Sequence, residues 1–348
     1  MELKNTNTQS AKPARPKAVA LLSGGLDSTL AISLLLDMGV EVEAVHFDSL
    51  FCNSASEGRR EKCGSEARRM SETLGVKLSI FNLTDDFLEI VKNPKHGWGS
   101  SMNPCIDCRI YMLRKAKEYM ERTGADFVVT GEVLGQRPMS QHLRAMRTIE
   151  QESGLDGLIV RPLCAKVMPP SKAEQEGLID REKLLALKGR SRKAQMQLAA
   201  DKGITDYAYP AGGCLLADKI FGRKLRELLS HRPDADLAEV RLLKYGRHFR
   251  LSDGSKIIVG RNEKENEKLE QLGSECMKLQ VADRLGPVTL APANIPEEMK
   301  LLAASITARY SQNKSHASLA IRCWMDGREE LLEAPPLDEE RLSAWRIE

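Results

Sequence analysis

The sequence predicts an α/β fold built on an open, doubly wound parallel sheet. Short apolar runs at residues 18–22, 42–47, 76–81 and 127–130 are separated by segments in which apolar residues recur with helical spacing. This alternation is typical of parallel β-α-β units, which bind their ligands at the carboxyl ends of the strands. We therefore expect a ligand cleft at that edge of the sheet.

The pattern changes twice beyond the predicted sheet. From about residue 165 the strand signal vanishes, and Pro169-Pro170 opens a run of basic amphipathic helices. After Tyr245 alternation returns around Asp253-Gly254, a two-residue hairpin signal. We expect a helical extension and then a small α+β domain with a helix near 296–309 and a strand near 317–323. The predicted parts are a disordered tail (1–16), a catalytic domain (17–165), a basic helical region carrying Cys214 (166–244) and a C-terminal domain (245–348).

Composition indicates a soluble cytoplasmic protein that does not bind membranes. Apolar residues make up 42% of the 348 residues, the start is polar and basic, and no apolar run approaches the roughly 20 residues of a membrane span. Residues 172–250 hold 17 Lys or Arg against 11 Asp or Glu. This excess is typical either of a solvated surface or of a surface that binds a phosphate backbone.

The first apolar strand runs directly into the string Ser23-Gly24-Gly25-Leu26-Asp27-Ser28 and then a helix. Paired glycines let the backbone approach an anion, and a helix start presents unpaired N–H groups to it. Asp27 would repel phosphate, so its useful role is to bind a Mg²⁺ ion that bridges phosphates. The Walker and Gly-x-Gly-x-x-Gly patterns are absent. The string predicts a pyrophosphate site, with an ordinary strand-to-helix turn as the alternative.

Three of the eight cysteines form a second candidate site. Cys105 and Cys108 open a predicted helix, whose dipole is expected to lower their pKa. Cys214 follows two glycines. The three thiols are consistent with an iron–sulfur cluster that leaves one iron open, with a persulfide or disulfide relay, or with part of a zinc site. Isolated cysteines are expected to be small buried side chains; they are Cys52, Cys63, Cys164, Cys276 and Cys323.

The string SGGLDS is similar to the signature of the PP-loop ATP pyrophosphatases, which have the adenine nucleotide alpha-hydrolase-like fold. The resemblance implies that ATP is cleaved to AMP and pyrophosphate. It also implies contacts from adenine to the backbone of His46 and Phe47, and from phosphates to Ser23, Gly24, Gly25, Leu26, Asp27 and Ser28.

Residues 130–146, TGEVLGQRPMSQHLRAM, resemble a segment of the bacterial tRNA 4-thiouridine synthetases. The resemblance covers about residues 17–165. It implies that the cleft for ATP and substrate is lined by Thr130, Gly131, Gln136 and Ser140. The pair in NPCIDC, together with Cys214, looks like the cluster-dependent tRNA thiolases. That resemblance implies a [4Fe-4S] cluster held by Cys105, Cys108 and Cys214.

Residues 257–266, IIVGRNEKEN, resemble the RNA-binding domain of the NFACT ribosome-quality-control proteins. The long RNA-binding region that usually precedes the catalytic domain of 4-thiouridine synthetases is absent from this sequence, as is a rhodanese-like sulfur carrier. The resemblance implies that the C-terminal domain recruits RNA instead.

Together these features predict an ATP-dependent tRNA sulfurtransferase that makes 4-thiouridine or 2-thiouridine. The base carbonyl oxygen attacks the α-phosphate of ATP, pyrophosphate leaves, and sulfide then displaces AMP from the activated carbon. A stacked base cannot react in this way, so the base must be exposed or flipped out. The predicted catalytic residues are Asp27, which binds Mg²⁺, and Cys105, Cys108 and Cys214.

The expected partners are tRNA and either sulfide or a sulfur donor protein. A homodimer is one assembly compatible with the sequence. Three alternatives stay open. The cysteines could form a persulfide relay, or the loop could serve another PP-loop reaction such as amidation. In the third alternative, the chain is an RNA- or ribosome-binding protein with a vestigial nucleotide site.

Overall fold

The computed structural model describes residues 15–52, 64–207, 213–283, 285–311 and 317–347. These residues form two compact units, and each is described by itself. The first unit comprises described residues within 15–83, 94–97 and 104–213; the second comprises those within 84–93, 98–103 and 214–347. Among the described residues, no helix has both the length and the apolar character needed to cross a bilayer.

The first unit is built on a five-stranded sheet in which every pairing is parallel. Its order is β3-β2-β1-β4-β5, so the chain reverses direction across the sheet between β1 and β4. A ligand of an open α/β sheet binds at such a reversal. The strands are β1 (Lys17–Leu21), β2 (Glu41–Asp48), β3 (Lys77–Asn82), β4 (Phe127–Val129) and β5 (Ile159–Val160).

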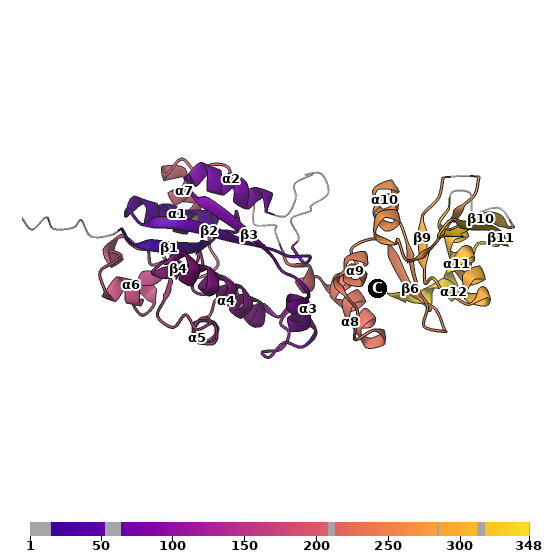
Figure 1. Ribbon diagram of the computed structural model, residues 1–348, viewed down its shortest axis with the longest axis horizontal. Coiled ribbons are helices and arrows are strands. Elements are labelled where there is room, and N and C mark those ends of the chain that lie inside the picture. Colours follow the sequence, from indigo (N-terminus) through magenta and orange to yellow (C-terminus); the bar gives the residue numbers. More distant parts are fainter. Residues whose placement is uncertain (1–14, 53–63, 208–212, 284, 312–316, 348) are drawn as a thin grey trace, which may run out of the picture. The chain divides into compact units, whose positions relative to one another are not determined.

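Helices cover both faces of this sheet, as Figure 1 shows. One face packs its small side chains, such as Ala20 and Ala44, against Leu30 of α1 and Met70 of α2, and the other packs Val19 and Val128 against α4 and α5. The doubly wound fold is thereby confirmed. The helices are α1 (Leu26–Asp37), α2 (Ser65–Leu74), α4 (Cys105–Thr123), α5 (Leu143–Glu152), α6 (Lys172–Gln175) and α7 (Lys193–Asp201).

The second unit contains a seven-stranded antiparallel sheet of order β11-β10-β8-β9-β7-β6-β12. The predicted small α+β domain is therefore present. Its strands are β6 (Arg247–Arg250), β7 (Lys256–Val259), β8 (Met277–Val281), β9 (Thr289–Ala291), β10 (Leu319–Met325), β11 (Arg328–Ala334) and β12 (Arg346–Ile347).

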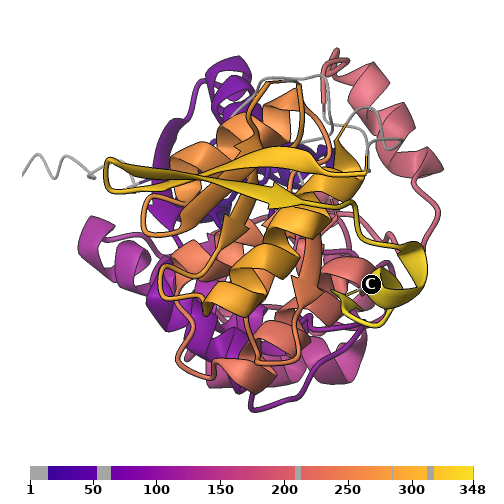
Figure 2. The same cartoon turned by 90° about the vertical axis from the view of Figure 1, so that its right-hand side faces the viewer.

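Helix α11 (Glu297–Tyr310) lies across one face of this sheet, as Figure 2 shows. Its Ala303, Ala304 and Ile306 are fully buried with Phe249 and Ile321 of the strands. The small residues let helix and sheet approach closely, which forms the core of the unit. The other helices are α3 (Asp85–Lys92), α8 (Lys219–His231), α9 (Leu237–Leu242), α10 (Glu263–Leu272) and α12 (Glu339–Ser343).

The hairpin predicted at Asp253-Gly254 joins β6 and β7, but its turn differs from the two-residue prediction. The Leu251 N–H donates to the Ser255 carbonyl at 2.9 Å, so three residues form the loop. Gly254 has a φ of +90°. A left-handed residue at the end of the loop is the usual solution for a three-residue hairpin.

The predicted helical region, residues 166–244, contributes to both units. Helices α6 and α7 belong to the first, and α8 and α9 belong to the second. The predicted boundaries at residues 165 and 244 stay predictions. Most of the predicted tail, residues 1–14, lies outside the described residues.

Candidate functional site

The predicted phosphate loop lies between β1 and α1, where the sheet order reverses. Its two serines close the loop: their hydroxyl oxygens are 3.1 Å apart, and the Ser28 hydroxyl donates to the Gly25 carbonyl at 3.0 Å. Gly25 is the N-cap of α1 and provides no side-chain cap. The first N–H groups of the helix therefore face this loop with the positive end of the helix dipole, which suits an anion.

Two glycines are required here by close packing. Gly24 has a φ of +77°, and a Cβ there would lie 2.6 Å from the backbone of Glu66 in α2. A Cβ on Gly131, which follows β4, would lie 2.5 Å from the amide nitrogen of Ser28. Real Cβ contacts are not that short. The segment beginning at Thr130 is therefore packed directly on the phosphate loop.

Asp27 is the polar centre of this arrangement. Its Oδ2 atom accepts a hydrogen bond from Gln136 at 2.7 Å and lies 3.5 Å from the Arg192 guanidinium. Its Oδ1 atom is buried and has no hydrogen-bond partner among the described residues. A buried carboxylate oxygen without a donor is suited to a hard cation such as Mg²⁺.

The remaining predicted nucleotide residues frame the loop. His46 on β2 is hydrogen-bonded through Nδ1 to the Leu22 carbonyl at 2.8 Å, which ties β2 to the residue before the loop. Phe47 stacks on Phe81. The Leu26 side chain is buried, so its contribution at the loop surface is its backbone. Ser140 is also buried.

Sequence reasoning missed Glu132, which lies in the same motif as Thr130. Glu132 is 1% exposed. Its carboxylate accepts hydrogen bonds from Arg109 and Arg161 at 2.8–3.1 Å and from the Thr130 hydroxyl at 3.1 Å. Burial alone would raise its pKa, but the two guanidinium charges outweigh burial and lower the pKa of Glu132 to about 2. The sequence did show an acidic residue within the string Thr130-Gly131-Glu132. Its partners, Arg109 and Arg161, are 23 and 29 residues away along the chain, so the pairing could not be read from the string.

Cys105 and Cys108 begin α4, so their thiols lie one helical turn apart. The predicted lowering of the Cys105 pKa is wrong. Burial of this thiol raises its pKa, and the nearby Arg137 and Arg109 only partly oppose that effect. Desolvation of the thiolate therefore outweighs the nearby positive charges here.

The third cysteine, Cys214, lies in the second unit and is the N-cap of a short 3-10 helix (Leu215–Ala217). Within that unit, the Met102 N–H donates to the Leu216 carbonyl at 2.9 Å. The Ser101 hydroxyl donates to the Asp218 carbonyl at 3.1 Å. Met102 precedes Cys105 by three residues, and Leu216 follows Cys214 by two.

The other cysteines are less suited to a site. Cys164 is buried beside the Glu132 carbonyl, and burial raises its pKa to about 11. Cys323 is buried in the core of the second unit. Cys52 and Cys276 are half-buried, and Cys63 lies outside the described residues. Within each unit, the described residues contain no group of three His, Cys, Asp or Glu side chains arranged to hold a metal ion.

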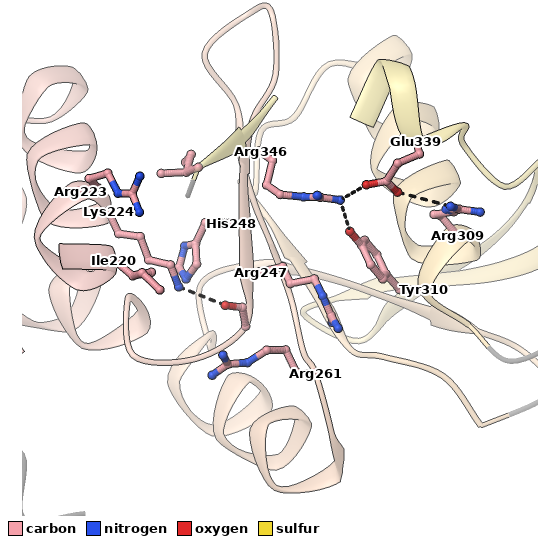
Figure 3. Close-up of a pocket in the computed structure, with 12 residues that line it drawn as sticks. Ile220, Arg223, Lys224, Arg247, His248, Arg261, Arg309, Tyr310, Glu339 and Arg346 are labelled. Atoms are coloured by element: carbon pink, nitrogen blue, oxygen red, sulfur yellow. Dashed lines mark hydrogen bonds and ion pairs between the residues drawn. The ribbon is translucent and has the colours of Figure 1, made fainter. Parts of the chain in front are cut away.

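A second site lies within the second unit, in a pocket of about 510 Å³ between α8, the start of β6 and the end of α11. Figure 3 shows cationic side chains entering it from these different elements. Glu339 is the one carboxylate among the described residues that line it. The cations are Arg223, Lys224, Arg247, Arg261, Arg309 and Arg346.

Charge in this pocket is only partly compensated. Arg309 and Arg346 share Glu339, and Arg346 also donates to the Tyr310 hydroxyl at 3.0 Å (Figure 3). The Arg247 guanidinium lies 4.5 Å from the centre of the Tyr310 ring and makes no ion pair with a carboxylate of the described residues. Such a concave, positive and aromatic surface suits phosphate groups and nucleotides.

Burial and positive charge also change the titration of two pocket residues. Lys224 is buried and donates to the carbonyls of Leu243 and Gly246. Burial, with the charges of Arg261 and Lys256, lowers its pKa to about 8. Burial and the same cationic surroundings hold the pKa of His248 well below its usual value. An anion in the pocket would relieve this repulsion.

The strand order, the loop after β1 and the Thr-Gly-Glu segment after β4 give the first unit a PP-loop-like fold. Residues 14–167 match the family described as Thiamine biosynthesis protein (ThiI), and residues 246–346 match the NFACT protein RNA binding domain. These two matches agree with the resemblances that the sequence indicates, one in the first part of the chain and one in the last.

Curated relatives match about a third of the chain. The tRNA-specific 2-thiouridylase MnmA of Syntrophotalea carbinolica is 32% identical over 114 residues, which are 32% of each chain. A probable tRNA sulfurtransferase of Methanothermobacter thermautotrophicus is 33% identical over 121 residues, which are 34% of this chain and 30% of the relative. The chain thus spans about a third of the length of the curated relatives that it matches.

Solved structures match parts of the chain at low overall similarity. A 4-thiouridine synthetase in complex with RNA and ATP is 26% identical, with a TM-score of 0.35, over 56% of this chain and 54% of that chain. The U34-tRNA thiolase NcsA of Methanococcus maripaludis, with its [4Fe-4S] cluster, is 16% identical, with a TM-score of 0.30, over 66% of this chain and 70% of that chain.

Proposed function

We propose that this protein is an ATP-dependent tRNA uridine sulfurtransferase that forms AMP and pyrophosphate. The observation that carries the proposal is the phosphate loop at the sheet reversal, with the buried Asp27 oxygen at its centre, in a segment that matches the ThiI family. The matching relatives named above are tRNA thiolases. The product is 4-thiouridine or 2-thiouridine.

The residues of the loop bind and orient the nucleotide. The Ser23 and Ser28 hydroxyls and the first N–H groups of α1 bind phosphate oxygens, and Asp27 Oδ1 binds Mg²⁺. Mg²⁺ supplies charge stabilisation for the departing pyrophosphate. Thr130 and Gly131 hold the other wall of the cleft against the loop, so that the α-phosphate faces the base carbonyl oxygen.

For sulfur transfer we propose a [4Fe-4S] cluster held by Cys105, Cys108 and Cys214. Two thiols one turn apart on α4 suit two of the ligands. The third ligand, Cys214, is proposed from the resemblance of the three cysteines to the cluster-dependent tRNA thiolases.

We further propose that the cationic pocket of the second unit binds the phosphates of tRNA. Residues 246–346, which supply most of the pocket lining, match an RNA-binding domain family. The pocket is lined by six cationic side chains and one carboxylate. Sulfide, or a sulfur donor protein, is the proposed source of sulfur.

Cysteine variants test the cluster. Anaerobically purified protein is expected to contain iron and acid-labile sulfide and to absorb near 400 nm as Fe–S proteins do, at about four irons per chain. Cys105→Ser, Cys108→Ser and Cys214→Ser should each lose cluster and thiolation together. The matched control is Cys276→Ser, a half-buried cysteine of the second unit. Full thiolation by metal-free protein supplied with a persulfide donor would establish the relay instead.

A further inference from the structure

The phosphate loop lacks a cation of its own. Residues 23–28 contain one acidic residue and no Lys or Arg. Asp27 and the phosphates of a nucleotide would repel each other, and one Mg²⁺ ion leaves the triphosphate with net negative charge. A nucleotide site of this kind therefore gains from a cation that is contributed by another part of the chain.

Three buried polar atoms without partners surround the loop. Besides Asp27 Oδ1, the Arg192 Nε and Gln195 Oε1 atoms are buried and lack hydrogen-bond partners among the described residues. Gln195 is 1% exposed, and its amide donates to Gln136 at 3.2 Å, while Gln136 donates to Asp27. Buried polar groups of native proteins are nearly always paired, so three unpaired atoms around one point indicate a position that binds a polar ligand.

Backbone contacts hold Arg192 at this point. Lys188 and Leu134 form an isolated parallel bridge, and the Gly189 N–H donates to the Leu134 carbonyl at 2.7 Å. Helix α7, which begins directly after Arg192, packs against α1. The position of Arg192 therefore depends on the fold around it as well as on its contact with Asp27.

The contact between Arg192 and Asp27 is weak enough to exchange. Its N···O distance of 3.5 Å exceeds that of a good charge-assisted hydrogen bond, which is about 2.7–2.9 Å. A guanidinium group with an unused Nε–H can bind phosphate oxygens in a bidentate manner. Residue 192 also lies outside the segment that matches the ThiI family, which ends at residue 167.

We propose that Arg192 is a phosphate-binding residue of the nucleotide site and that Gln195 positions Gln136 and Asp27 for it. When Mg²⁺ binds Asp27 Oδ1 and ATP enters, the Arg192 guanidinium leaves Asp27 Oδ2 and contacts the β- and γ-phosphates that leave as pyrophosphate. This inference rests on the proposed ATP-dependent function.

Nucleotide affinities of Arg192 variants test the proposal. Arg192→Ala is expected to weaken the binding of Mg²⁺·ATP and of Mg²⁺·pyrophosphate at least about tenfold by calorimetry, the loss typical of a hydrogen bond to a charged group. AMP lacks the β- and γ-phosphates, so its affinity should change less than about threefold. Arg192→Lys keeps the positive charge but lacks the planar guanidinium group, so its affinity for Mg²⁺·ATP should lie between those of the wild type and Arg192→Ala. Lys193→Ala, an exposed neighbour, is the matched control.

Each outcome separates the two proposals. Unchanged or tighter ATP binding by Arg192→Ala would overturn the role of Arg192. Equal losses for ATP and AMP would also overturn it, since they would indicate a structural role. If Arg192→Ala does not fold, the same comparison is made with Arg192→Lys: a larger loss of affinity for ATP than for AMP supports the proposal, and equal losses overturn it. A wild-type protein that binds neither Mg²⁺·ATP nor pyrophosphate would refute the proposed function itself.

Discussion

The two sites differ in how their charges are balanced. Beside the phosphate loop, Arg109 and Arg161 are paired with the buried Glu132, and Arg192 faces Asp27. In the pocket of the second unit, six cations line the surface with one carboxylate. Balanced charges in a buried site fix geometry, whereas unbalanced charges on a concave surface attract a polyanion. The first site is thus suited to position a small reactant and the second to hold a long phosphate chain.

The largest expected effect comes from breaking the balance around Glu132. Glu132→Gln leaves the half-buried Arg109 without a carboxylate and the buried Arg161 with Glu150 alone, so the free energy of unfolding should fall by about 3 kcal/mol. Urea denaturation monitored by circular dichroism measures this change. Glu152→Gln is the control, because its partners Lys95 and His96 are near the surface and its loss should cost less than about 1 kcal/mol. Equal stability of the two variants would contradict the role assigned to Glu132.

The next effect is on chemistry. Asp27→Ala removes the proposed Mg²⁺ ligand, and tRNA-dependent release of pyrophosphate should fall by about 100-fold or more, as for the loss of a single group that stabilises the transition state. Asp37→Ala changes another carboxylate of α1, exposed and paired with Lys202, and should keep full activity. Pyrophosphate release that survives in Asp27→Ala would remove this loop from the mechanism.

Several features of these two sites follow from the sequence, because they depend on neighbours along the chain. A strand, a Gly-Gly turn and a helix start are contiguous, so the phosphate loop was predicted residue by residue. Glu132 and Arg192 were missed because their partners lie 23 to 165 residues away and are brought together by the sheet order. The Cys105 pKa was predicted in the wrong direction because a helix dipole can be read from the sequence, whereas burial cannot.

A smaller effect is expected in the cationic pocket. Arg247→Ala removes one guanidinium group, and tRNA affinity should fall several-fold while the slope of log K against log salt becomes shallower by about 0.7–0.9. Filter binding at four salt concentrations measures both quantities. Lys268→Ala removes an exposed cation of α10 outside the pocket and should leave the slope unchanged. Equal slopes for wild type and Arg247→Ala would place the RNA phosphates elsewhere.

The smallest effect is a pH dependence. The pKa of Lys224 is lowered to about 8, so its charge is present at pH 7 and largely lost at pH 9. Losing a cation weakens the attraction for phosphate, and tRNA affinity should therefore fall by less than about tenfold as pH rises through 8. Lys224→Met should bind tRNA more weakly at pH 7 and show a flatter profile from pH 7 to 9. A rise in wild-type affinity with pH would contradict this assignment.

The most direct test of the central claim is nucleoside analysis of tRNA after reaction. Unmodified tRNA would be incubated without oxygen with the protein, Mg²⁺·ATP and sulfide, then digested and analysed by mass spectrometry. The account predicts a thiouridine formed in equal amount with AMP and pyrophosphate, and none when ATP is omitted or when Asp27→Ala replaces the wild type. Thiouridine formed without ATP, or AMP formed with no thionucleoside under cluster-replete conditions, would contradict it.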